Sequence, residues 1–307
     1  MNLSNRRESS NIEDRRGKSG GGMPLGGINL GGMLGGGGKG RLGCGTIILV
    51  LAFLFLMSGG DLGKMFQMIG GMDGGVATEQ TTDGNYRGDE TEEALALFTS
   101  QILASTEDVW TEQFQKMGRT YQAPTLVMYT GSIQTGCGNG SAAMGPFYCS
   151  ADQKVYIDLS FFRDMKQTLG ADGDFAYAYV IAHEVGHHVQ NLLGDLGKAH
   201  QQMARLSSAD ANQISVQIEL QADFYAGFWG HHEQRLFHSM ERGDLEEALV
   251  TAQKIGDDYL QKKAQGYSNS KTYTHGTSAQ RERWFRRGWT SGDLSQGDTF
   301  SVPYSKL

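Results

Sequence analysis

Apolar residues recur at helical spacing in several segments of the C-terminal two thirds of the chain. The first segment, residues 92–114, has the pattern of an amphipathic helix. The second, FAYAYVIAHEVGHHVQNLL, ends at Gly194, and the third runs from Ser207 or Ser208, as a possible N-cap, to about Met240. Two further helices are predicted at DLEEALVTAQKIGDDYLQKKA and SAQRERWFRRG.

Three short runs with strand character, TLVMYT, PFYCS and KVYIDLS, lie between the first two helices and are separated by turn residues. Together these segments predict an α+β body over residues 91–307. We expect a small antiparallel sheet, followed by a mainly helical half that carries the chemically unusual residues.

The first 90 residues have a different pattern. Residues 1–41 contain many of the 44 glycines, and such a segment buries too little apolar surface to offset its backbone entropy, so we expect it to be disordered. Residues 42–60 include an uninterrupted apolar run, 46–57, and with its flanks they reach the roughly 17–20 residues that a membrane-spanning helix needs. We interpret them as a transmembrane signal anchor, with a buried core helix as the alternative. Residues 61–90 look like a flexible linker.

Basic residues predict the orientation of this anchor. Seven lysines and arginines precede it, whereas Lys64 alone follows within twenty-five residues, so the positive-inside rule keeps the N-terminus in the cytoplasm. The body would then lie on the periplasmic side of a bacterial inner membrane. There, Cys137 and Cys149 are expected to form a disulfide, with two buried thiols as the alternative. The net charge of −7, without a basic stripe in the body, argues against a nucleic-acid partner.

Two histidines and a glutamate interrupt the apolar face of the second helix. His183 and His187 are four residues apart, so they share a helix face and can bind one ion, while Glu184 can contact a water on that ion. This HExxH pattern places two zinc ligands and a general base on one turn. A buried imidazole or carboxylate is costly unless it is paired or bound to a metal, so the segment favours a zinc site.

The third helix supplies a candidate for the third ligand that a catalytic zinc requires. Glu219 lies among apolar residues, and Asp223 follows four residues later on the same face. We expect Glu219 to bind the metal and Asp223 to accept the outer N–H of a ligating histidine. The alternative is that both carboxylates pair with arginines on a solvated face. Two carboxylates at this spacing repel each other, which favours a cation between the helices.

Three residues near the C-terminus are further candidates. His275 or Tyr273, just before a predicted helix, could donate to the oxyanion that forms during peptide hydrolysis. An ordinary loop histidine is the alternative. Arg281 could pair with Asp223 or with a substrate carboxylate, and a solvated position on the surface is equally consistent with the sequence.

The motifs CG…GPFYC, VYIDLSFF, AHEVGHHVQ, ELQADFYAG and THGTSAQRERWF together resemble the putative neutral zinc metallopeptidase family (YpfJ-like proteins) of bacteria. HExxH with a distant ExxxD is also similar to the gluzincin-type zinc peptidases. The resemblance implies a zincin-like catalytic domain in which His183, His187 and Glu219 bind Zn²⁺, Glu184 is the base and Asp223 supports a ligating histidine. The THG…R segment is similar to THP…R in HtpX-type and CAAX prenyl proteases, with Gly276 in place of the proline.

We therefore expect a membrane-anchored zinc endopeptidase that acts on peptide or protein substrates. An extended substrate could pair with an edge strand such as Lys154–Asp158. One alternative is a non-catalytic, membrane-tethered scaffold with a structural zinc, which would need a fourth ligand that the sequence does not suggest. Another is a metal hydrolase of a non-peptide amide.

Overall fold

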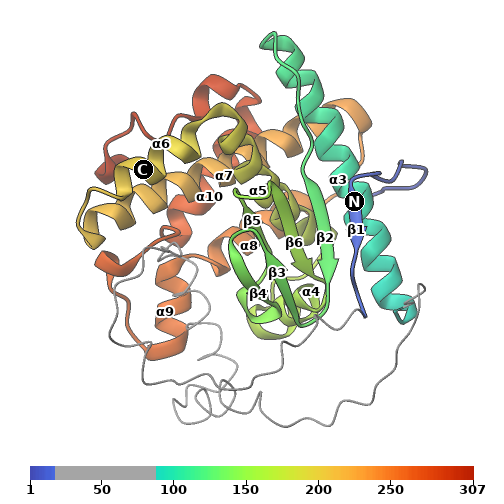
Figure 1. The fold of residues 1–307 in the computed structure, drawn as a ribbon, viewed down its shortest axis with the longest axis horizontal. Coiled ribbons are helices and arrows are strands. Elements are labelled where there is room, and N and C mark those ends of the chain that lie inside the picture. Colours follow the sequence, from blue (N-terminus) through green and yellow to red (C-terminus); the bar gives the residue numbers. More distant parts are fainter. Residues whose placement is uncertain (18–87) are drawn as a thin grey trace.

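The computed structural model describes residues 1–17 and 88–307 (Figure 1). The helices are α3 (Glu90–Lys116), α4 (Ser160–Asp164), α5 (Asp174–Leu193), α6 (Asp195–Met203), α7 (Ser208–Phe237), α8 (Asp244–Lys254), α9 (Asp257–Gln265) and α10 (Ser278–Ser291). The strands are β1 (Ile12–Asp14), β2 (Thr125–Tyr129), β3 (Ser132–Thr135), β4 (Gly138–Ser141), β5 (Phe147–Cys149) and β6 (Lys154–Asp158). The structure confirms a mixed α and β fold.

Local sequence signals explain where the long helices begin and end. The Ser207 hydroxyl accepts the backbone N–H of Asp210 at the start of α7, which satisfies a helix donor that has no partner within the helix. Thr277 and Gln280 form a capping box at the start of α10. Gly194 ends α5 with φ 87°, a conformation that glycine adopts without strain.

The main sheet has the strand order β1-β2-β6-β5, and the prediction of an antiparallel sheet is wrong for most of it. Strands β1, β2 and β6 are parallel, whereas β5 runs antiparallel to β6. The separate β3–β4 hairpin lies in the connection between β2 and β6. That long connection brings the chain back to the same end of the sheet, so β6 enters in the direction of β2.

Two further expectations about this part of the chain are also wrong. The strand Lys154–Asp158 is β6, which lies between β2 and β5 and is therefore not an edge strand. Residues 1–17, expected to be part of a disordered segment, include β1 and pack against the body. The predicted anchor, 42–60, and nearly all of the predicted linker, 61–90, lie outside the described residues. Within the described ranges, no helix combines the length and the apolar character needed to cross a bilayer.

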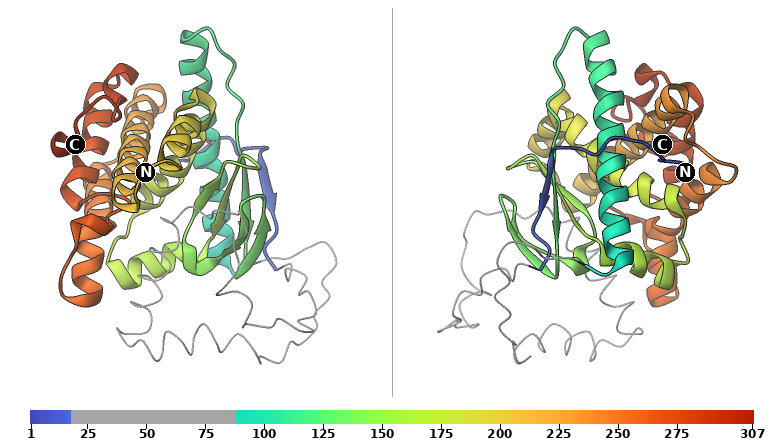
Figure 2. Two further views of the ribbon diagram at one scale, coloured as in Figure 1. Left: turned by 60° about the vertical axis from the view of Figure 1, so that its left-hand side comes forward. Right: turned by 90° about the vertical axis from the view of Figure 1, so that its right-hand side faces the viewer.

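The helices pack in layers on one face of the sheet. Figure 2 shows the sheet on one side of α3 and the C-terminal helices on the other. Helix α5 contacts the sheet, α3 and α7, and α7 in turn packs along α10. Glycines permit this last contact, because a Cβ at Gly227 would lie 2.0 Å from the Phe285 carbonyl oxygen and one at Gly288 would lie 2.1 Å from that of Phe224. The close approach brings α10 within reach of the residues on α5 and α7.

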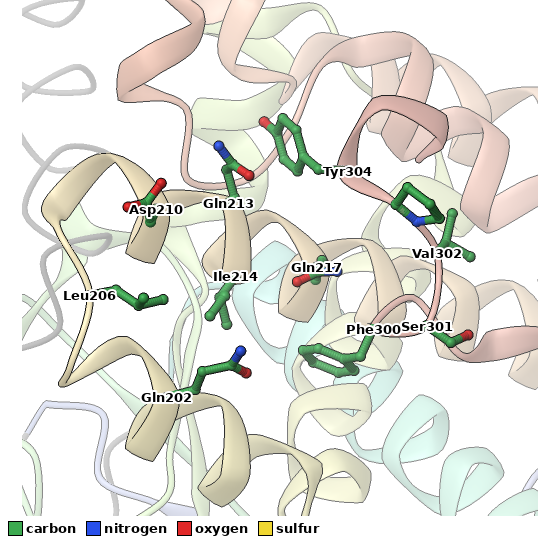
Figure 3. Close-up of a pocket in the computed structure, with 11 residues that line it drawn as sticks. Gln202, Leu206, Asp210, Gln213, Ile214, Gln217, Phe300, Ser301, Val302 and Tyr304 are labelled. Atoms are coloured by element: carbon green, nitrogen blue, oxygen red, sulfur yellow. The ribbon is translucent and has the colours of Figure 1, made fainter.

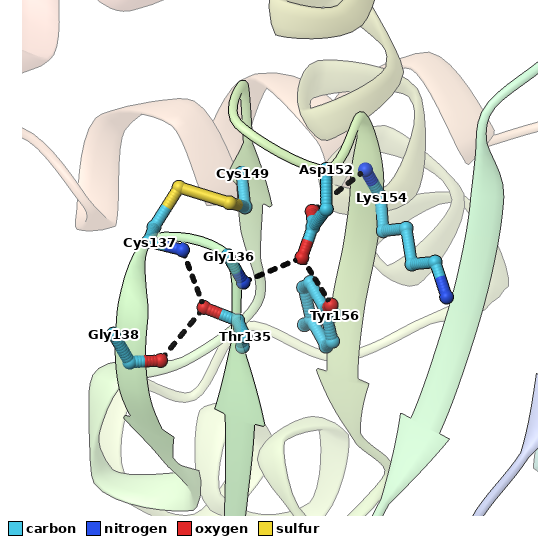
Figure 4. The surroundings of a disulfide bond; sticks show 8 residues. All are labelled: Thr135, Gly136, Cys137, Gly138, Cys149, Asp152, Lys154 and Tyr156. Carbon is cyan, nitrogen blue, oxygen red and sulfur yellow. Dashed lines mark hydrogen bonds between the residues drawn. A yellow bond between two sulfur atoms is a disulfide. The ribbon is translucent and has the colours of Figure 1, made fainter.

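A disulfide joins Cys137, next to the β3–β4 hairpin, to Cys149 at the end of β5 (Figure 4). The neighbouring Asp152 carboxylate accepts the backbone N–H of Gly136 and the hydroxyl of Tyr156, both at 2.7 Å. The disulfide and these hydrogen bonds hold the hairpin close to β5 and β6, and Ile133 of β3 packs in one cluster with Val127 and Tyr156 of the sheet.

Candidate metal centre

Helices α5 and α7 bring three ligand atoms to one point. His183 and His187 share a face of α5, and Glu219 faces them from α7. One ligand atom from each of these residues lies within 4.8 Å of the other two. The Nε2 atoms of His183 and His187 are 3.1 and 3.6 Å from the Glu219 carboxylate oxygens. The residues that the sequence predicts as zinc ligands are therefore together in space.

A glycine in the motif allows the two helices to approach. A Cβ at Gly186 would lie 3.1 Å from the carbonyl oxygen of Ala222 and 3.2 Å from its Cα, both backbone atoms of α7. Glycine costs about 1 kcal/mol relative to alanine in a helix interior. The close approach of α7 explains why the chain has glycine here, because a side chain would push Glu219 away from the histidines.

The outer nitrogen of His183 contacts a buried charged network. Its Nδ1 is 2.9 Å from the Asp223 carboxylate, which is fully buried and accepts two hydrogen bonds from Arg281 at 2.9 Å. The Tyr179 hydroxyl donates to the same carboxylate at 2.5 Å. Burial alone would raise the pKa of Asp223, but Arg281 and His183 outweigh it and hold that pKa at about 2. Asp223 is therefore a permanent anion that fixes the orientation of the His183 ring.

His187 has a neutral support instead. Its Nδ1 lies 2.9 Å from the Gln190 side-chain oxygen, and the Gln190 amide donates to the Ile218 carbonyl and to Gln221. Burial, only partly opposed by the Glu219 charge, lowers the pKa of His187 to about 4. His187 is thus neutral at physiological pH, which is the form that binds a metal. Sequence reasoning missed Gln190, although its position three residues after a ligating histidine was a usable signal.

Glu184 lies beside the ligands and outside their group. It is 9% exposed, and burial raises its pKa to about 7, although the charge of His183 and the backbone N–H of Tyr148 oppose that rise. Tyr148 belongs to β5, so the edge strand of the sheet runs next to this carboxylate. A carboxylate with a pKa near neutrality can both accept and return a proton at physiological pH.

The donor set fits zinc. Two imidazole nitrogens and one carboxylate oxygen form the ligand set of a catalytic zinc with one open position. Among residues 1–17 and 88–307, the group that could hold a metal consists of these three residues, without a fourth. Burial would raise the pKa of Glu219, but His275 and His187 lower it below its usual value, so it is ionised as a metal ligand must be.

Comparison with known proteins agrees with this geometry. A family model described as "Putative neutral zinc metallopeptidase" matches residues 1–300. The chain belongs to this family.

Among its relatives, YpfJ of Escherichia coli is 51% identical over 300 residues, which cover 98% of this chain and 99% of that protein. Rv2575 of Mycobacterium tuberculosis is 40% identical over 192 residues, or 59% of this chain and 64% of that protein. No solved structure matches the chain. The family expected from the motifs is confirmed, and with it a zinc peptidase at the level of the family.

In this member of the metallopeptidase family, His275 is held by a carboxylate that sequence reasoning did not identify. Asp257, at the start of α9, approaches the Nδ1 of His275 at 3.2 Å and accepts the backbone N–H groups of Thr274, His275 and Gly276. His275 is 7% exposed, and although burial lowers its pKa, the negative charges of Glu219 and Asp257 raise it above the usual value. The side chain is therefore buried near the metal ligands.

Tyr273, the other candidate for the oxyanion donor, and His188 have different surroundings. Tyr273 is 5% exposed and packs in the hydrophobic core. His188, next to a ligand in sequence, turns away from the site. Its ring nitrogens contact the Tyr148 hydroxyl at 3.0 Å and the Gln122 carbonyl at 2.6 Å, so it links α5 to β5 and to the segment before β2.

A cavity of about 440 Å³ lies where the end of α6, the start of α7 and residues 300–304 meet (Figure 3). Its lining combines the amides of Gln202, Gln213 and Gln217 with apolar side chains such as Phe300. None of the three metal-ligand candidates lines it. The candidate metal centre is thus at the α5–α7 interface rather than in this cavity.

Proposed function

We propose that the protein is a zinc-dependent endopeptidase that hydrolyses peptide bonds with an activated water molecule. One observation carries the proposal: three ligand atoms on α5 and α7 lie within 4.8 Å of one another, with the Glu184 carboxylate beside them. A structural zinc is normally closed by four protein ligands and has no use for an adjacent base. The set of three therefore supports catalysis rather than a scaffold role.

Bound zinc would supply a Lewis acid that polarises the substrate carbonyl and lowers the pKa of water. Glu184 accepts the proton of the attacking water, and its pKa of about 7 suits this role. The same carboxyl then donates that proton to the leaving amine nitrogen. Throughout the reaction, Asp223 and Gln190 hold the two ligating imidazoles in fixed orientations.

His275 is the best candidate for the donor to the oxyanion, and Asp257 is its positioning residue. The Nδ1 of His275 faces Asp257, which leaves Nε2 as the donor toward substrate. Tyr273 is a weaker candidate, because it is buried in the hydrophobic core.

The sheet edge beside the site is a suitable place for an extended substrate. Strand β5 is an outer strand of the sheet, and the backbone of Tyr148 interacts with the Glu184 carboxylate. A peptide added to β5 would form main-chain hydrogen bonds next to the catalytic base. We propose β5 in place of Lys154–Asp158 as the substrate-binding strand. Attachment to a membrane through residues 42–60 is a separate proposal, and it concerns contact with the membrane rather than a single crossing of it.

Metal dependence tests this function. Full-length protein is assayed on a denatured protein substrate before and after chelation, and again after one equivalent of Zn²⁺ is restored. His187→Gln should lose bound zinc and proteolysis together. His200→Gln, which changes an exposed histidine on α6, is the matched control and should keep both. Full proteolysis by the His187 variant, or by chelated protein, would exclude the proposed zinc peptidase.

A further inference from the structure

The first 17 residues form part of the folded body. Strand β1 pairs in parallel with β2 from Ile12 opposite Leu126 to Asp14 opposite Met128. At the two ends of this pairing, the Leu126 N–H donates to the Asn11 carbonyl and the Arg15 N–H donates to the Met128 carbonyl, both at 2.8 Å. Figure 1 shows this strand, in blue, beside β2 and α3. Without it, the edge of β2 would expose unpaired backbone groups.

The body also has a side chain suited to receiving this segment. Glu107 lies in the middle of α3 and is 8% exposed. Its carboxylate accepts hydrogen bonds from the Ser9 hydroxyl at 2.5 Å, the Asn11 amide at 2.7 Å and the Arg7 guanidinium at 2.9 Å. A buried carboxylate is costly unless it has such partners. Its partners named here all come from residues 1–17, so the helix and the segment form one polar network.

Three of the four arginines of this segment pair with carboxylates of the body, and Arg15 pairs within the segment. Four of the seven basic residues that predicted a cytoplasmic N-terminus lie in residues 1–17. The structure pairs each of them with a carboxylate: Arg6 with Asp108, Arg7 with Asp108, Arg15 with Glu13, and Arg16 with Glu93. Their role in the fold removes much of the reason to interpret them as signals of membrane orientation.

We propose that residues 1–17 and residues 88–307 lie on the same side of any membrane that this chain contacts. Paired strands are about 5 Å apart, whereas a bilayer core is about 30 Å thick, so β1 and β2 cannot pair across it. The chain between the two parts then crosses a membrane either not at all or an even number of times. A single crossing with the N-terminus in the cytoplasm and the body in the periplasm is incompatible with the β1–β2 pairing. The inference is independent of the proposed peptidase activity.

Accessibility to a membrane-impermeant maleimide tests the shared compartment. Two single variants, Glu8→Cys and Leu206→Cys, report on the segment and on the body at exposed positions. Both are made in full-length protein that also carries Cys44→Ser, and that parent provides the background signal. For each position, labelling in intact spheroplasts is divided by labelling after lysis. The ratios at the two positions should agree within about twofold. Strong labelling of one position with protection of the other would overturn the proposal.

A second experiment tests the docking itself. A site for a sequence-specific protease is inserted shortly after residue 17 in the full-length protein, which is then cut and passed through a gel-filtration column. The N-terminal fragment should remain with the body. Glu107→Ala should speed its release at least tenfold, whereas Glu112→Ala, on the same helix but paired with Lys116 and Arg235, should not. A fragment that separates from the unsubstituted body would overturn the docking and, with it, the inference.

Discussion

Replacing Glu184 by glutamine should separate catalysis from folding. Glutamine has nearly the same shape but cannot accept the proton of the attacking water, so proteolysis should fall by about 10²–10⁴-fold. Because Glu184 lies outside the group of three ligand atoms, bound zinc should remain near one equivalent.

The same substitution should stabilise the metal-free protein. The pKa of Glu184 is raised from 4.5 to about 7 because the folded protein buries the carboxyl. The unfolded chain therefore ionises first as pH rises, and the stability of the folded state falls between pH 4.5 and about 7. At ~1.36 kcal/mol per pKa unit, this difference corresponds to about 3 kcal/mol, fully lost above pH 7. Glutamine does not ionise, so the variant should keep this stability of the folded state as the pH rises.

The assay is urea unfolding of chelator-treated parent and Glu184→Gln at several pH values from below 4.5 to above 7. The titration of distant groups cancels in the difference between the two proteins, whereas His183 and Glu219, which interact with Glu184, also contribute to it. That difference should grow by about 3 kcal/mol in favour of the variant across this range. In a parallel assay, proteolysis by the zinc-loaded variant should be about 10²–10⁴-fold below that of the parent. An unchanged difference would refute the buried, protonated carboxyl, and a fully active variant would refute the base assignment.

Three other substitutions test the surroundings of the site. Asp223→Asn removes the charge behind His183 and should weaken zinc binding about 10–100-fold in a chelator competition; unchanged affinity would contradict its orienting role. Asp257→Asn should lower kcat more than it raises KM in steady-state proteolysis, because His275 loses its orientation; equal kcat would argue against that residue as an oxyanion donor. Gly186→Ala places a methyl group 3.1 Å from a backbone oxygen of α7. Overpacking of about 1–3 kcal/mol should exceed the ~1 kcal/mol gain in helix propensity and lower the Tm, and an equal or higher Tm would contradict the close approach.

The proximity of the three candidate metal ligands could be predicted from the sequence, because the periodicity of a helix determines which residues share a face. His183 and His187 had to share a face, and so did Glu219 and Asp223, once their segments were recognised as helices. The structure explains the unfavourable Gly186 in a helix interior by the close approach of the α7 backbone. The meeting of the two helices was inferred from the cost of burying acids and imidazoles among apolar residues.

The sheet could not be predicted in the same way. Periodicity shows that a run forms a strand but does not give its direction, and the long connection before β6 permits a parallel pairing that short turns would exclude. In residues 1–17, polar contacts add to the burial of Met1 and Leu3, which are 9% exposed and belong to the hydrophobic core. The polar residues that make these contacts, such as Ser9 and Glu107, leave no hydrophobic periodicity in the sequence. The glycine-rich continuation was therefore sufficient to suggest disorder for the entire N-terminal region.

Gly276 shows why a departure from a motif has to be interpreted in three dimensions. Proline cannot adopt the φ of 94° that Gly276 has. The Gly276 N–H also donates a hydrogen bond to Asp257 at 3.1 Å, and proline has no N–H to form it. The THG segment is therefore fixed by a buried carboxylate that accepts three consecutive N–H groups. The same carboxylate contacts His275, so Gly276 is part of the arrangement that holds this histidine in place.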